Sequence, residues 1–218
     1  MKKLPSLLSL ITTIAILACA AIPALAAETV RQFKKDLPTG DARRVHLDFP
    51  VGELVVEGAA GAQVALDVHL TCKHSRDACR EAAQKVRLVY STDGDALVVR
   101  MRDWPKWSGH GLEARIHVQV PRALPLKANL GVGELRISAV ASDVTADLGV
   151  GEVRVTMPAG AVGSVHADTG VGEAVLVAGG RRYESAGLFG RRVTWKEGKG
   201  AATVRVDCGV GEVDVRLQ

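Results

Sequence analysis

Apolar and polar residues alternate in several short segments of the chain, the pattern of β-strands with one buried face. A period of two places successive side chains on opposite faces of a sheet. Between two such segments, Thr92-Asp93-Gly94-Asp95 predicts a hairpin turn, because glycine readily adopts positive φ. The chain is therefore expected to consist mostly of strands. The clearest alternating positions are Val64, Leu66, Val68 and Leu70, then Leu97, Val99 and Met101, then Ile116, Val118 and Val120.

Residues 75–86 have helical spacing instead and predict the one helix of the chain. Ser75 is suited to cap its N-terminus, and Asp77 falls in the first turn, where a negative charge is favourable. The apolar face of this predicted helix consists of Ala78, Ala82, Ala83 and Val86.

A six-residue pattern recurs: Asp or Asn, a variable residue, Gly, Val, Gly, Glu. Four copies begin at Asn129, Asp147, Asp168 and Asp207, and an earlier copy has Pro50 at the first glycine. Regular repetition predicts stacked copies of one unit, which is typical of scaffolds and binding surfaces. The final Gly-Glu pairs are Gly52 and Glu53, Gly133 and Glu134, Gly151 and Glu152, Gly172 and Glu173, and Gly211 and Glu212.

The spacing of the copies predicts one more, decayed, unit. The second glycines are separated by 18, 21 and 39 residues, and the last step is the sum of the first two. A fifth corner is therefore expected at Gly190, where Arg191 stands in place of glutamate. The C-terminal half would then contain five units in alternating short and long steps.

Each Gly-Val-Gly-Glu segment is expected to form a sharp corner between two short strands, because glycine tolerates φ values that a Cβ forbids. The preceding Asp or Asn can bond the backbone of the turn, and the valine can either enter the core or cap it. In-register stacking would space like corners about 4.8 Å apart. The acids then serve either turn capping and solubility or binding of a divalent cation such as Ca²⁺. The expected column is Glu134, Glu152, Glu173, Arg191 and Glu212, with Asn129, Asp147, Asp168 and Asp207 beside it and Arg191 relieving its repulsion.

Residues 1–26 have the features of a secretory signal peptide. A basic start is followed by an apolar run and by the small-residue site Ala24-Leu25-Ala26, so the mature chain is expected to begin near Ala27. An alternative is a lipoprotein anchored at Cys19, because Ile16-Leu17-Ala18-Cys19 loosely resembles a lipoprotein box. No other stretch is suited to span a membrane.

The mature chain is expected to fold as one domain in which an N-terminal β module, residues 27–122, packs against a repeat array, residues 123–218. The module would contain the helix and the hairpin. Removal of Lys2 and Lys3 lowers the formal charge from +4 to +2. This near balance argues against nucleic acid as a partner.

Sequence motifs of enzymes are absent. The chain has no Gly-x-Ser-x-Gly elbow, no phosphate-binding Gly-Lys-Ser/Thr and no His-Glu-x-x-His, and its six histidines share no spacing. Neither catalytic residues nor a cofactor nor a resident metal are therefore expected.

The cysteines favour an exported protein. Cys72 and Cys79 are spaced for a disulfide that joins a strand to the helix. The alternative is a metal site formed by Cys72, His74 and Cys79. Cys208 occupies the inward position before its corner and is interpreted as a buried hydrophobe, with a reactive thiol as the alternative.

The most unusual loop is Trp104-Pro105-Lys106-Trp107. Two of the three tryptophans lie here beside a cation, a composition suited to a sugar face, a lipid interface or a protein hot spot. The alternative is that Trp104 and Trp107 cap an open end of the stack.

The leader, the helix and hairpin insertion and the repeated Gly-x-Gly-acid corners resemble the bacterial putative-adhesin family, also called Toastrack, over nearly the whole mature chain. The resemblance implies an all-β, β-solenoid-like stack of short strands with Gly-x-Gly-Glu corners. It also implies a periplasmic or secreted protein linked to adhesion or to envelope stress, with an unidentified protein or glycan partner. The alternative is a carbohydrate- or lipid-binding module that uses the Trp104/Trp107 loop.

Overall fold

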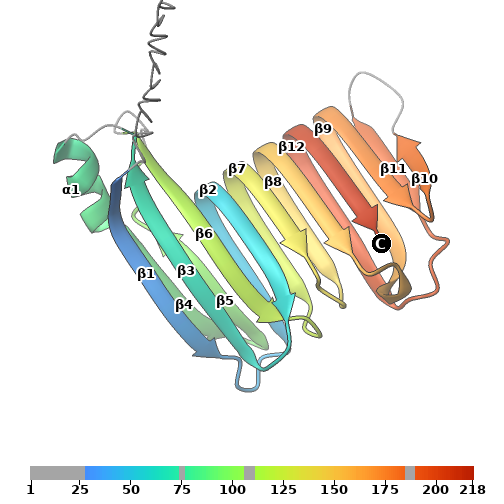
Figure 1. The fold of residues 1–218 in the computed structure, drawn as a ribbon, viewed down its shortest axis with the longest axis horizontal. Coiled ribbons are helices and arrows are strands. Elements are labelled where there is room, and N and C mark those ends of the chain that lie inside the picture. The colour runs from blue at the N-terminus through green and yellow to red at the C-terminus, as the bar shows by residue number, and fades with distance from the viewer. Residues whose placement is uncertain (1–27, 74–76, 106–110, 185–189) are drawn as a thin grey trace, which may run out of the picture.

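Long strands that fold over on themselves build most of the molecule (Figure 1). The computed structural model describes residues 28–73, 77–105, 111–184 and 190–218. Within these ranges the structure is all-β apart from one helix, α1 (Asp77–Lys85), and a short 3-10 turn, η1 (Ala159–Ala161). The strands are β1 (Glu28–Pro38), β2 (Arg44–Ala59), β3 (Gln63–Cys72), β4 (Arg87–Asp93), β5 (Ala96–Arg102), β6 (Leu112–Pro121), β7 (Leu126–Ser138), β8 (Val144–Met157), β9 (Val162–Ala178), β10 (Arg181–Glu184), β11 (Arg191–Trp195) and β12 (Ala202–Leu217).

Each long strand has two limbs that face one another across the core. In β8, Ala146 and Leu148 are buried before the corner and Val153 and Val155 are buried after it, whereas Val150 at the corner is exposed. We call the part before the corner the first limb and the part after it the second limb. Strands β2, β7, β9 and β12 repeat this pattern, so the core is a narrow layer filled mainly by Val, Leu and Ala.

The first repeat strand, β2, divides the sheet in two at the N-terminal end. Its first limb pairs with β5, which pairs with β4, and its second limb pairs with β6, which pairs with β3 and then β1. Helix α1 contacts β1, β3 and β6, and Cys79, Ala82 and Ala83 are its buried residues. The observed helix lies within the predicted range, while Ser75 falls outside the described residues.

Two local predictions agree with the structure. The expected hairpin joins β4 to β5, and its Gly94 has a φ of +59°. Cys72 and Cys79 form a disulfide with a Cα–Cα distance of 6.1 Å, which fastens α1 to the end of β3. The alternative metal site at these cysteines is wrong, because the disulfide leaves no thiolate to bind a metal.

The predicted order of the repeats is wrong. Strand β12, the last of the chain, lies between β8 and β9 and runs parallel to both, so the spatial order is β2-β7-β8-β12-β9. The 39-residue step arises because the chain builds β10 and β11 on the outer side of β9 before it returns to form β12. The motifs of β8, β9 and β12 differ only at their second residue. Either β9 or β12 could therefore pair with β8 in the same register.

Gly190 does not form a fifth corner of the same kind. Its φ is +63°, whereas the five second glycines of the motif, Gly52 to Gly211, have φ values of 135° to 142°. Arg191 begins β11, which pairs antiparallel with the first limb of β9. Strand β10 pairs antiparallel with the second limb, so this short pair closes the C-terminal end of the stack.

Close packing of successive corners explains the invariant glycines. A Cβ on Gly151 would lie 1.8 Å from the carbonyl oxygen of Gly133, and one on Gly211 would lie 1.7 Å from that of Gly151. Any side chain would therefore collide with the backbone of the next strand. Pro50 is tolerated in the first repeat because the pairing of β2 with β5 ends at Asp48 and its pairing with β6 starts only at Glu53. The stretch of β2 between them is therefore free on one side.

Candidate functional site

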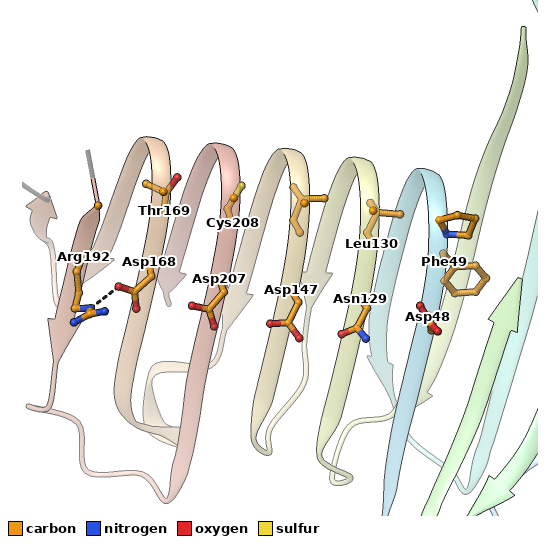
Figure 2. A pocket seen from close by; sticks show the side chains of 17 residues that line it. Asp48, Phe49, Asn129, Leu130, Asp147, Asp168, Thr169, Arg192, Asp207 and Cys208 are labelled. Carbon is orange, nitrogen blue, oxygen red and sulfur yellow. Dashed lines mark hydrogen bonds and ion pairs between the residues drawn. The ribbon is translucent and has the colours of Figure 1, made fainter. Parts of the chain in front are cut away.

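A row of polar side chains crosses the outer face of the first limbs, just before the corners (Figure 2). The strands are in register there, so each contributes one residue to the row. The sequence-based expectation had these residues in sequence order; the inserted β12 instead places Asp207 between Asp147 and Asp168. In spatial order the row is Arg100, Asp48, Asn129, Asp147, Asp207, Asp168 and Arg192.

The row borders a groove of about 710 Å³, which we call the aspartate groove. Two residues after each Asp or Asn of the four complete motifs comes a glycine on the same face, and these glycines line the groove without side chains. The backbone of the neighbouring strand leaves no room for a side chain at these positions. A Cβ on Gly149 would lie 2.4 Å from the carbonyl oxygen of Gly131. The groove-lining glycines are Gly131, Gly149, Gly209 and Gly170.

Three of the four aspartates in the row have an ion-pair partner, and Asp207 has none among the described residues. Arg100 lies 3.2 Å from Asp48 at one end, and Arg192 forms an ion pair with Asp168 at the other. Asp147 lies 3.7 Å from Lys127. Asp207, between two other aspartates, forms no ion pair with any residue in the described part of the chain.

The pKa of Asp207 reflects this position. Partial burial raises the pKa of Asp207 above its ordinary value, and the negative charges of Asp147 and Asp168 raise it further. Arg205 and Arg192 oppose this rise without cancelling it. Asp207 is thus a hydrogen-bond-accepting carboxylate without an ion-pair partner among the described residues.

Asn129 brings a different chemistry to the row. Its Nδ2 lies 3.1 Å from Nε2 of His46, and its buried Oδ1 has no hydrogen-bond partner among the described residues. Burial and the charge of Lys127 lower the pKa of His46, so the ring is neutral at pH 7 and Nε2 can accept the amide proton. Asn129 thereby separates Asp48 from Asp147 without adding a charge.

The motif glutamates lie on the opposite side of the molecule, on the outer face of the second limbs. The expectation that they stand beside the aspartates is therefore wrong, because the corner reverses the chain between the two rows. Arginines interleave the glutamates: Arg136 lies 2.5 Å from Glu134 and 3.1 Å from Glu53, and Arg154 pairs with Glu152. The spacing of two residues from Glu134 to Arg136 could have revealed these pairs in the sequence.

Arg191 contacts this second row as expected from the sequence. Its guanidinium lies 3.2 Å from Oε1 of Glu173 on the neighbouring strand. The glutamate row is consequently neutralised at Glu53, Glu134, Glu152 and Glu173.

The corner valines form an exposed apolar row between the two faces. They neither enter the core nor cap it, because each sits at the outermost point of its corner. The exposed fractions are 48% for Val132, 47% for Val150, 48% for Val210 and 45% for Val171.

The tryptophan loop is only partly described. Trp104 is half-buried and packs against the core, whereas Lys106 and Trp107 lie outside the described residues. Its role as a recognition loop therefore stays a prediction.

Cys208 is buried at the inner side of the groove-forming strand. Burial raises the pKa of its thiol, and its Sγ lies 4.0 Å from the carbonyl oxygen of Gly151. A thiol that stays protonated and enclosed is a poor nucleophile, which favours the interpretation as a small hydrophobe.

The described residues lack both a clustered metal site and a membrane-spanning helix. No group of three or more His, Cys, Asp or Glu side chains there has the arrangement of a metal site. Within the same ranges, no helix has both the length and the apolar composition needed to cross a bilayer.

Comparison with known proteins identifies the fold. No protein-family model and no curated protein matches the chain. A putative cell adhesion protein from Clostridium sporogenes superposes with a TM-score of 0.51 at 16% sequence identity, over 86% of this chain and 99% of that one. The resemblance to the putative-adhesin family is confirmed at the level of the fold.

Two further solved structures align at lower scores, which add nothing to that conclusion. A putative adhesin from Parabacteroides merdae has a TM-score of 0.24 at 10% identity, over 85% of this chain and 81% of that chain. A putative lipid binding protein from Parabacteroides distasonis has a TM-score of 0.28 at 10% identity, with coverages of 84% and 80%.

Proposed function

We propose that this protein is an exported, non-catalytic interaction protein of the cell envelope, adhesin-like in role, and that the aspartate groove is its binding face. The groove carries the proposal because it offers one hydrogen-bonding side chain per strand over five neighbouring strands. At about 4.8 Å per strand, the acceptors from Asp48 to Asp168 extend over about 19 Å. A ligand that follows them must be extended and must run across the strands.

The chemistry of the groove selects the kind of ligand. Ionised carboxylates only accept hydrogen bonds, so the partner must present hydroxyl or ammonium donors at regular intervals. A linear glycan of the envelope or surface meets this requirement, because its hydroxyls repeat along an extended chain. The glycine-lined wall lets such a chain approach the backbone closely.

Other observations support an exported, non-catalytic protein. The disulfide between Cys72 and Cys79 suits an oxidising compartment. A solved structure that shares the fold is described as a putative cell adhesion protein. The leader at residues 1–26 is consistent with both.

The proposal is tested by binding of the mature chain to an envelope preparation. The Asp147→Ala/Asp207→Ala variant removes two central acceptors, and Glu212→Ala removes an acid from the opposite face of the same β12. We expect the double variant to lose binding and the Glu212→Ala variant to retain it, with both shown to be folded by circular dichroism. Retained binding in the double variant would contradict the assignment of the groove.

A third variant addresses the alternative recognition site. If Trp104→Ala abolishes binding while the groove variant binds normally, the tryptophan loop rather than the groove contacts the ligand.

A further inference from the structure

The position of β12 is unusual for the last strand of a chain. It is hydrogen-bonded on both sides, in parallel, to β8 from Val204 through Leu217 and to β9 from Ala202 through Arg216. Removal of β12 would leave β8 and β9 each with an open edge, two strand widths apart. The middle of the stack is therefore a slot that the C-terminal segment of the chain fills.

The two edges of this slot match each other. Asp207 pairs with Asp147 on one side and with Asp168 on the other, and Gly211 pairs with Gly151 and Gly172 in the same way. Every motif position is thus aligned across all three strands.

The inward faces of the slot strands also match. The residues that face the core are apolar at nearly every aligned position, with Thr169 as the exception. Any strand with this motif and this apolar alternation fits the slot. The buried inward residues are Val144, Ala146, Leu148, Val153 and Val155 in β8, Val165, Ala167, Thr169, Ala174 and Leu176 in β9, and Val204, Val206, Cys208, Val213 and Val215 in β12.

The connection into β12 is suited to act as a hinge. Residues 196–201 join β11 to β12 and include Gly198 and Gly200. Backbone hydrogen bonds join both glycines to the start of β9, 3.2 Å from the Gly198 N–H to the Gly163 oxygen and 3.3 Å from the Gly200 N–H to the Val162 oxygen. A change in these six residues could direct β12 away from its own stack.

We propose that β12 is an exchangeable strand and that two copies of this chain form a dimer by inserting β12 reciprocally into each other's slot. The strand that fits the slot in all these respects is β12 itself, so the occupant in a dimer is the β12 of a second copy. Exchange of an identical strand reproduces every contact of the slot. The free energies of the monomer and of the exchanged dimer therefore differ mainly through the hinge and the entropy of association. The reciprocal arrangement closes on itself and gives a dimer rather than a fibre.

The test uses the register between β12 and β8. Arg205 of β12 pairs with Thr145 of β8, whereas Thr156 lies at the other end of β8, opposite Arg216. One full-length mature preparation carries Arg205→Cys with one tag, and a second carries Thr145→Cys with a different tag. The two are unfolded together with the native disulfide intact, refolded at high protein concentration and cross-linked by a short bismaleimide.

We expect a cross-linked species that contains both tags and elutes as a dimer. The matched control pair, Arg205→Cys with Thr156→Cys, should give only the background seen without added cysteines. Equal cross-linking in both pairs would indicate unspecific association and overturn the proposal.

A single-chain variant keeps the test decisive. Arg205→Cys/Thr145→Cys on one chain must cross-link within the chain if β12 occupies its own slot. Efficient cross-linking of that variant, together with no mixed-tag product from the first pair, would show that β12 does not exchange.

Discussion

Asp207 of β12 lies directly in register with Asp147 of β8, so two carboxylates face the groove on adjacent parallel strands. Asp168 continues the row on the other side, which makes Asp207 the most crowded acid of the site. Like charges opposed across strands are unfavourable. Asp147 and Asp168 have ion-pair partners in Lys127 and Arg192, whereas Asp207 has none in the described part of the chain. Binding chemistry and stability are therefore in conflict at this position.

Asp207→Asn is expected to stabilise the fold at pH 7. The substitution removes the like-charge repulsion and preserves the size of the side chain, with a gain below about 1 kcal/mol for so exposed a group. Thermal unfolding of the variant beside wild type checks this. Asp41→Asn, outside the row, serves as the control and should leave the melting temperature unchanged; a destabilised Asp207→Asn would show that the carboxylate is favourable where it lies.

The pH dependence of stability should have a definite sign. The pKa of Asp207 is raised in the folded state relative to the unfolded chain, so the folded state takes up the proton first as the pH falls. The contribution of this group to stability should increase as the pH falls through the raised pKa towards the unfolded value. The difference in unfolding free energy between wild type and Asp207→Asn should accordingly shrink between pH 7 and pH 4. A difference in unfolding free energy that stays constant over this pH range would contradict the raised pKa of Asp207.

Gly151→Ala should destabilise the stack strongly. The added Cβ would meet the Gly133 carbonyl oxygen at 1.8 Å, and the residue has a φ of +139°. Strain and collision together are expected to cost on the order of 2–4 kcal/mol. Denaturant unfolding measures this loss, with Gly160→Ala as the control because a Cβ there meets no atom within 4 Å. A variant as stable as wild type would refute the close packing of the corners.

Part of this architecture could be predicted from the sequence. The alternation in segments such as Val64–Leu70 identified strands, and the Gly-Val-Gly-Glu copies identified stacked repeats, because each is a local pattern with a local physical cause. The spacing of Cys72 and Cys79 likewise predicted their disulfide. The aspartates of the groove were visible as motif residues.

The strand order could not be read in the same way. The copies at Asp147, Asp168 and Asp207 are the same at five of six positions, so pairing preferences do not distinguish β9 from β12 as the neighbour of β8. The 39-residue step suggested a hidden copy at Gly190, but the chain uses that length for β10 and β11. The groove itself was missed, although an acid followed two residues later by glycine in successive strands is its sequence signature.

Loss of the disulfide should weaken the attachment of α1. Cys72 and Cys79 are seven residues apart, and opening so short a loop is expected to cost about 2.5 kcal/mol on the chain-entropy estimate. The Cys72→Ser/Cys79→Ser variant should unfold at lower denaturant concentration than wild type. Reductant should lower the stability of wild type towards that of the variant and leave the variant unaffected; equal stability of the two under oxidising conditions would show that the bridge contributes nothing.

The central claim is that the aspartate groove contacts the ligand, and amide chemical-shift mapping tests it most directly. The mature chain, labelled with ¹⁵N, is titrated with a linear glycan fraction from the envelope. We expect the amide signals of four glycines to shift first and furthest, since these residues line the groove: Gly131, Gly149, Gly209 and Gly170. Shifts confined to the glutamate row of the second limbs, or to residues around Trp104, would contradict it.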